Sequence, residues 1–359
     1  MTQDFIVIGG GIAGVSAAAR LARLGSVTLL EAEDHLAHHT SGRSAALFEP
    51  NYGLAPIVAL SRASEDHLRT AHGGVLSRRG MMLVAGRDEA DAFEIDRVAL
   101  GLDRIGVDEA RAMVPVLDPA AVAEAAFADH AWDIDTDRLI QDFARDARAA
   151  GAAILTRARV AAIRRDRGLW HVTSGQGEHS ARMLVNAGGA WVDEIAMLAG
   201  LRPIGFTPLR RSMARIPAPE GQDVSRWPLI MGAAESWYAK PDAGALIVSP
   251  AEEDPSHPHD AWADDMVLAE GLARYEAKVT APVTRLLASW AGLRTFSPDR
   301  VLVIGPDPAE PSFFWLAGQG GYGFQTSAAA SELAADLIAG RAPGLDAATC
   351  AALSPARFG

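Results

Sequence analysis

The stretch DFIVIGGGIAG, residues 4–14, decides the fold of this chain. Residues 5–8 form a continuous apolar run, which is typical of a strand buried in a parallel sheet. The glycines after it fit G-x-G-x-x-G at Gly9, Gly11 and Gly14, and residues 12–24 carry apolar side chains at helical spacing. A second apolar run ends at Glu31. The sequence therefore predicts a strand, a helix and a strand within about thirty residues, a βαβ unit.

This unit has the parts of a dinucleotide-binding site. Glycine lets the backbone turn tightly and approach a pyrophosphate, the helix N-terminus offers free N–H groups, and an acid at the end of the second strand binds ribose hydroxyls. A tight packing bend is the alternative explanation for a glycine cluster. Because Gly9, Gly11, Gly14 and Glu31 all stand in the required context, we predict dinucleotide binding. These residues do not distinguish a nicotinamide from a flavin.

Composition and charge limit the function. The formal net charge of -12 repels phosphate backbones, so we predict no nucleic-acid partner. Cys350 is the single cysteine, which excludes an intrachain disulfide. The N-terminal apolar segment is interrupted by glycines and by Arg20 and Arg23, and it fits neither a signal peptide nor a membrane-spanning helix. We expect a cytoplasmic protein without an integral membrane segment, and peripheral contact with the inner membrane remains an alternative.

The chain leaves the nucleotide-binding fold and later returns to it. A chain of 359 residues exceeds the ~250–300 residues at which one core usually divides. An apolar, strand-like run followed by glycines recurs at 181–191 and at 313–323. Residues 201–290 instead contain short predicted strands separated by Pro, Gly and Asp. We predict an α/β fold with a discontinuous Rossmann-type domain and a second, α+β substrate domain built on an antiparallel sheet. The expected ranges are 1–73, 133–200 and 291–359 for the first domain, and 74–132 and 201–290 for the second.

Eight segments in a fixed order carry a resemblance: VIGGGIAG, HTSGRSAALF, DIDTDRL, LVNAGGAW, RRS, ESWYAKPDAG, WAGLRTF and FFWLAGQGGYGFQTSAA. With them the chain resembles the D-amino-acid oxidase superfamily of flavoproteins, in its glycine oxidase and bacterial D-amino-acid dehydrogenase branch. Within that branch it is most similar to the FAD-dependent D-arginine dehydrogenases. The resemblance implies noncovalent FAD, a small-molecule amino-acid substrate, and a quinone or oxygen as electron acceptor.

The resemblance also assigns cofactor-binding segments. Residues 40–46, TSGRSAA, would run backbone N–H groups and a cation past the flavin, although an ordinary polar loop is the alternative. The glycines of GQGGYG precede a helix whose N-terminus would face the flavin pyrimidine. The predicted cofactor-binding residues are Gly9, Gly11, Gly14, Glu31, Arg43, Ser44, Ala45, Gly188, Gly320, Gly321, Tyr322 and Gly323.

Covalent attachment of the flavin and metal binding are both disfavoured. His38 and His39 lie beside the flavin loop, but relatives with the TSGRS form generally hold FAD noncovalently. His257 and His259 lack regular metal-ligand spacing, and a solvated loop explains them better. We predict no metal.

Two arginines are the candidates for holding a substrate carboxylate. Arginine offers a bidentate fork to a carboxylate. The resemblance places Arg294 of WAGLRTF and Arg211 of PLRRSMARI at the clamp positions. Strand alternation points Arg210 to the opposite face, as a surface or scaffold charge. Tyr238 and Tyr52 match tyrosines that line or cover the substrate, and buried core tyrosines are the alternative.

The sequence departs from the D-arginine dehydrogenases at two positions. Leu47 replaces a histidine, and Gly80 stands where an acid would pair with a cationic side chain. A guanidinium buried without its counter-charge loses several kcal/mol. We therefore expect an apolar, enlarged pocket at Leu47, Phe48, Gly80 and Met82, and a neutral or hydrophobic substrate side chain.

The predicted reaction is oxidative deamination of a D-amino acid to the 2-oxo acid and ammonia by hydride transfer from Cα to flavin N5. Oxidation of glycine-like secondary amines or of 2-hydroxy acids is one alternative. A noncatalytic FAD-binding protein is the other.

Overall fold

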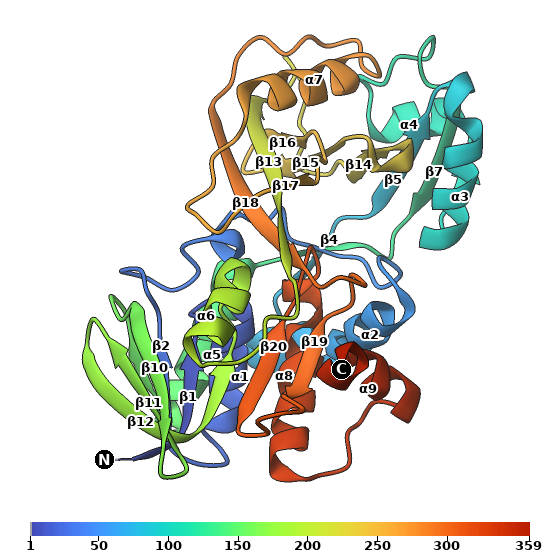
Figure 1. Cartoon of the computed structure of the whole chain (residues 1–359). Helices are drawn as coiled ribbons and strands as arrows, with labels where there is room; N and C mark the ends of the chain where they lie inside the picture. Colours follow the sequence, from blue (N-terminus) through green and yellow to red (C-terminus); the bar gives the residue numbers. More distant parts are fainter. Residues whose placement is uncertain (1) are drawn as a thin grey trace.

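Two large β-sheets organise the chain in the computed structural model, which describes residues 2–359 (Figure 1). One sheet lies in the lower lobe of the figure and the other in the upper lobe. The strands of the first sheet are β1 (Gln3–Ile8), β2 (Val27–Leu30), β9 (Ala153–Leu155), β10 (Val160–Asp166), β11 (Leu169–Ser174), β12 (Gly177–Asn186), β19 (Val303–Pro306) and β20 (Phe313–Ala317).

The first sheet has a parallel centre in the order β9-β2-β1-β12-β20. Antiparallel strands extend it, with β11 and β10 beyond β12 and with β19 beside β20. Residues 5–8 of β1 are all buried, because helices cover one face and the opposite face packs against a second apolar cluster. The continuous apolar run therefore forms the central strand that the sequence predicts.

Helices cover the first sheet and one small sheet lies beside it. Asp135 caps α5 by accepting a 3.0 Å hydrogen bond from the Arg138 N–H, which confirms the helix start predicted near residue 135. The helices of this lobe are α1 (Ile12–Leu21), α2 (Ala55–Thr70), α5 (Thr136–Ala149), α6 (Val192–Leu198), α8 (Gly323–Ala339) and α9 (Ala347–Leu353). The small sheet contains β3 (Leu47–Phe48), β8 (Trp132–Ile134) and β4 (Leu76–Arg78).

The second sheet is antiparallel except where β5 and β14 pair in parallel. Its order is β17-β13-β16-β15-β14-β5-β7-β6, with β18 on the other side of β13. The strands are β5 (Met81–Ala85), β6 (Asp103–Ile105), β7 (Glu124–Ala128), β13 (Thr207–Pro217), β14 (Leu229–Gly232), β15 (Tyr238–Asp242), β16 (Ala245–Ser249), β17 (Asp254–Pro255) and β18 (Ala288–Phe296). The helices of this lobe are α3 (Ala90–Leu100), α4 (Val107–Met113) and α7 (Asp265–Glu276).

Strands β13 and β18 run together from the lower lobe into the upper lobe (Figure 1). Residues 291–296, which we expected in the nucleotide-binding domain, belong to β18 and hydrogen bond to β13 in the second sheet. Within residues 2–359, the helices lack the combination of length and hydropathy that a bilayer crossing requires.

Candidate active site

Two cavities adjoin each other, one between the lobes and one within the first lobe. They share the lining residues Gly11, Thr40, Ser41, Ala187 and Gly189. One cavity continues to Glu31 at the end of β2, and the other continues to the substrate-domain sheet. Together they form an elongated space at the carboxyl ends of β1 and β2, which is where open α/β sheets bind nucleotides.

The glycines of the first turn have different roles. Gly9 has φ +110°, and a Cβ there would lie 2.3 Å from the Ala187 carbonyl oxygen. A Cβ on Gly14 would lie 1.9 Å from the Gly9 carbonyl oxygen, so this glycine permits close helix–strand packing and does not line either cavity. A Cβ on Gly11 would meet only Ser41 Oγ, at 3.2 Å. Gly11 is therefore the glycine that exposes the start of α1 to the cavities.

The acid at the end of β2 is held in place by backbone groups. Glu31 Oε2 accepts a 2.6 Å hydrogen bond from the Gly10 N–H, and Oε1 accepts a 2.8 Å bond from the Glu33 N–H. Its side chain is buried and lines the second cavity. An open helix N-terminus at one point and a fixed carboxylate further along match the pyrophosphate and ribose of a dinucleotide. The residues present fit FAD.

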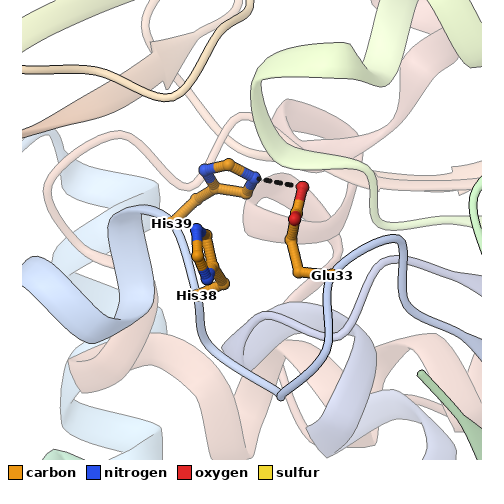
Figure 2. A group of neighbouring side chains, drawn as sticks. All are labelled: Glu33, His38 and His39. Carbon is orange, nitrogen blue, oxygen red and sulfur yellow. Dashed lines mark hydrogen bonds and ion pairs between the residues drawn. The ribbon is translucent and has the colours of Figure 1, made fainter. Parts of the chain in front are cut away.

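Histidines gather beside this second cavity. Figure 2 shows His39 pointing at Glu33, with Nε2 3.2 Å from Oε1, and His38 lying beneath it. Glu33, His38 and His39, and likewise Asp34, His35 and His38, have potential metal-ligand atoms within 4.8 Å of one another. Burial lowers the pKa of His39, which favours its neutral imidazole. The residues with ligand-like geometry are thus in 33–39, whereas the sequence pointed only to His257 and His259 as metal-ligand candidates.

Arg43 joins the flavin loop to the second lobe. Its guanidinium donates to the Ala261 carbonyl oxygen at 2.8 Å and to the Ala291 carbonyl oxygen at 3.0 Å, and it forms an ion pair with Asp260. Arg43 also lines the first cavity, as do Ser44 and Ala45. Its charge is thus already balanced by Asp260, so its clearest role in this structure is to position the loop.

The glycines before α8 lie against the other end of the first cavity. Gly320 has φ +51°, and a Cβ there would lie 2.3 Å from the Phe296 ring. A Cβ on Gly321 would lie 3.0 Å from Arg294 Cζ, so the guanidinium rests on this glycine. Gly323 begins α8, and the N-cap residue Tyr322 makes no side-chain hydrogen bond to the helix start. The helix thus begins two residues after the glycine that contacts Arg294.

Arg211 is buried, and its guanidinium is already paired. Its side chain is 3% exposed, and Nη1 donates to Glu235 Oε1 at 2.8 Å while Nη2 lies 3.4 Å from Glu253 Oε1. The neighbouring Arg210 points the other way and pairs with Asp254 at 2.8 Å, as strand alternation predicts. Arg211 lines the cavity, but two carboxylates compete for it before any substrate arrives.

Arg294 is less committed. Its side chain is 17% exposed, it lines the same cavity, and among residues 2–359 its one carboxylate neighbour is Glu235, with Nη1 3.9 Å from Oε1. Burial opposes its charge, but Tyr238, Tyr52 and Glu235 outweigh that effect and raise its pKa further, so it stays cationic. Arg294 is the cation most available to an entering anion.

Both predicted tyrosines line this cavity. Tyr52 donates to the carboxylate of Glu235, with its hydroxyl 3.0 and 2.9 Å from the two oxygens. Burial and then the Glu235 charge raise the pKa of Tyr52, so the phenol remains a donor. Tyr238 is buried, and its hydroxyl lies 3.4 Å from Met213 Sδ.

The apolar wall of the cavity differs from the predicted one, because the register of β5 is shifted by one residue. Leu47 lines the cavity, but Phe48, Gly80 and Met82 do not, and Met81 does instead. Strand alternation turns Met82 into the cluster on the opposite face of β5. Gly80 has φ +77°, and a Cβ there would meet the Phe127 ring at 2.8 Å, so this glycine serves the backbone turn. Met213, Leu229 and Met231 add further apolar lining from the second sheet.

Two acids in the cavity were missed in the sequence. Glu235 lies in an irregular turn and has no periodic pattern around it. Glu49 interrupts an apolar run, which is the only signal that marked it, and its Oε2 lies 3.0 Å from His130 Nε2. The contact with Glu49 raises the pKa of His130 despite partial burial.

The structure brings most of the predicted residues to the two cavities. Those that line them are Gly9, Gly11, Glu31, Arg43, Ser44, Ala45, Leu47, Tyr52, Gly188, Arg211, Tyr238, Arg294, Gly320, Gly321 and Gly323. Gly14, Gly80 and Tyr322 lie outside the lining, and Tyr322 packs its ring 5.2 Å from that of Tyr52.

Solved structures share this fold. Glycine oxidase from Geobacillus kaustophilus superposes with a TM-score of 0.83 at 21% identity and 98% coverage of both chains. L-proline dehydrogenase from P. horikoshii gives 0.84 at 22% identity, covering 99% of this chain and 98% of the other. At these identities the likeness shows the fold alone.

Two curated relatives are similar over nearly the whole chain. The tRNA 5-methylaminomethyl-2-thiouridine biosynthesis bifunctional protein of Burkholderia multivorans is 28% identical over 98% of this chain, and human mitochondrial dimethylglycine dehydrogenase is 24% identical over 99%. The chain spans 59% and 44% of the length of these relatives. The family model described as FAD dependent oxidoreductase (DAO) matches residues 4–337. The chain belongs to the FAD dependent oxidoreductase (DAO) family.

Proposed function

We propose that this protein oxidises the Cα–N bond of a D-amino acid with a neutral or hydrophobic side chain. The observation that carries the proposal is Arg294, a cation that faces the cavity with its nearest carboxylate at the edge of ion-pair distance. An arginine in a partly dry site favours a carboxylate, and it can hold one through two parallel hydrogen bonds.

The surrounding residues orient the substrate. Arg294 binds the carboxylate, and Tyr238, which lines the same cavity, offers its hydroxyl as a further donor. The apolar side chains of Leu47, Met213 and Met231 receive the substrate side chain. A noncovalently bound FAD supplies the chemistry of accepting a hydride from Cα. Loss of the hydride, with its two electrons, turns the amine into an imine. Water then hydrolyses the imine to the 2-oxo acid and ammonia.

Gly80 does not line the cavity, so the preference for a neutral substrate side chain cannot rest on the absence of an acid at that position. The acids of the cavity are Glu235, which is paired with Arg211 and Tyr52, and Glu49, which contacts His130. Because both acids already have partners in the protein, a substrate guanidinium would gain less from either of them than from an unpaired carboxylate. We keep the preference for neutral side chains, now based on the observed lining rather than on Gly80.

Three alternatives remain separable. Secondary amines or 2-hydroxy acids would use the same carboxylate anchor, and a noncatalytic flavoprotein would not need one. A tRNA substrate, suggested by the name of one relative, is disfavoured by the net charge of -12, because tRNA binding relies on neutralising phosphates.

Product analysis with an artificial electron acceptor tests the proposal. D-Leu, D-Met and D-Phe should yield their 2-oxo acids and ammonia, and their L-enantiomers should not. D-Arg should have a lower kcat/KM than these three. Faster turnover of a 2-hydroxy acid or a secondary amine than of every D-amino acid would move the assignment to that alternative, and no turnover of any of them would favour the noncatalytic one.

A further inference from the structure

Glu235 is presented to the cavity by an unusual turn. Ala234 (φ 57°) and Glu235 (φ 48°) are consecutive non-glycine residues in the left-handed region, between β14 and β15. Such conformations persist only where the surroundings impose them, and they concentrate at functional sites. Here the Ala234 N–H donates to Asp96 Oδ2 at 2.7 Å, and the buried Trp237 follows the turn. The fold therefore holds a carboxylate at this wall.

Neutralising Arg211 does not fully explain why Glu235 lies at the cavity. Arg211 has a second carboxylate, Glu253, which lies outside the cavity lining and also pairs with Arg300 at 2.9 Å. Glu235 is different because 31% of its side chain is exposed and it lines the cavity. Part of its carboxylate surface thus remains available to an entering molecule.

Arg294 and Glu235 together present opposite charges side by side. Arg294 Nη1 and Glu235 Oε1 are 3.9 Å apart on one wall of the cavity. A zwitterionic α-amino acid carries its carboxylate and its ammonium on the same carbon, Cα. Its carboxylate can therefore face Arg294 while its ammonium faces Glu235. A 2-hydroxy acid bound to Arg294 offers Glu235 a neutral hydroxyl in place of an ammonium, so it lacks the charge-assisted contact that an amino acid can make there.

We propose that Glu235 binds the amine nitrogen of the substrate and makes this site select α-amino acids over 2-hydroxy acids. The inference rests on the proposed function in one respect, that Arg294 holds the substrate carboxylate. It adds the group that recognises the nitrogen. Glu235 is thus a specificity-determining residue, and its role at binding does not require it to accept a proton.

Two unreactive ligands isolate this role. 2-Aminoisobutyrate and 2-hydroxyisobutyrate differ only in the amino or hydroxyl group, are achiral, and have no Cα hydrogen to transfer. Calorimetric titration of the FAD-loaded protein measures each dissociation constant without turnover. We expect the wild-type protein to bind the amino ligand about 10-fold or more tightly than the hydroxy ligand, the size expected for a charge-assisted hydrogen bond. In Glu235→Gln this ratio should fall to about 1, with the hydroxy ligand bound as tightly as before or more tightly.

Two variants control the experiment. Glu253→Gln removes the other carboxylate from Arg211 outside the cavity, and it should keep the wild-type ratio within about 2-fold, since its ion pairs are partly exposed. Glu235→Asp keeps the charge and should retain part of the preference for the amino ligand. It replaces Glu235→Gln as the test variant if Glu235→Gln fails to fold.

The ratio decides the result. A ratio unchanged in Glu235→Gln, a wild-type protein that binds both ligands equally or binds neither, or an equal tightening of both ligands in the variant would each overturn the inference. The last result would make Glu235 only a competitor for Arg294. Because neither ligand reacts, these outcomes are separate from failure of the proposed reaction, which would appear as a wild-type protein that oxidises no amino acid.

Discussion

Arg211 donates a 2.8 Å hydrogen bond from Nη1 to Oε1 of Glu235. Arg294 keeps its own Nη1 3.9 Å from that same oxygen. The two arginines that the resemblance assigns to the carboxylate clamp therefore have different surroundings in the structure. Arg211 is paired with two carboxylates of the protein, whereas Arg294 has a single carboxylate at a longer distance, which is why we propose Arg294 as the anchor of the substrate carboxylate.

The first prediction concerns Arg294→Met. Loss of the carboxylate anchor should lower kcat/KM by about 100-fold or more, because removing one partner of a buried charged pair typically costs 2–5 kcal/mol. FAD content should stay normal. Arg210→Met is the matched control, since Arg210 lies on the opposite face and pairs with Asp254. Steady-state kinetics and the flavin absorbance of both purified variants check this, and loss of FAD from Arg294→Met would place the residue in the cofactor scaffold.

The second prediction separates two glycines of the first turn. Gly11→Ala should leave the thermal stability of the FAD-free protein nearly unchanged and should weaken FAD binding, because the added methyl would meet only Ser41 and would face the cavity. Gly14→Ala should destabilise the FAD-free protein, because the methyl would overlap the Gly9 carbonyl. Melting temperatures and FAD titrations of both variants measure this. Equal effects of the two substitutions would contradict the division of roles.

The third prediction concerns pH and His130. The contact with Glu49 raises the pKa of His130 in the folded protein. A raised folded-state pKa contributes stability that is present below the unfolded pKa of about 6.5 and is lost as the pH rises through the folded value. Between about pH 6 and 9, the melting temperature of the wild type should therefore fall relative to that of His130→Gln. Parallel curves for the two proteins would show that the pair does not contribute.

The first lobe could be predicted because local rules determine it. The apolar run of β1, the glycine turn and the capping Asp135 each specify their structure within a few neighbouring residues. The cavity wall could not be predicted to the same precision. A shift of one residue on β5 exchanges Met82 for Met81, and nothing in the residues themselves fixes that register.

The acids of the cavity could not be predicted from the sequence either. Glu235 reaches the site through a left-handed turn that its own sequence does not require, and the turn is held by Asp96 on a distant helix. Its contacts with Tyr52 and Arg211 join residues 183 and 24 positions away in the chain. Pairings of this kind arise from tertiary structure, so the sequence could identify the arginines but not the charge already beside one of them.

The most direct test of the central claim is an anaerobic absorbance spectrum of the FAD-loaded protein after mixing with D-Leu and, separately, with L-Leu. We predict that D-Leu bleaches the flavin absorbance and that L-Leu leaves it unchanged. Bleaching by L-Leu alone would contradict the assigned stereochemistry, and a flavin that no D-amino acid bleaches would contradict the proposed reaction.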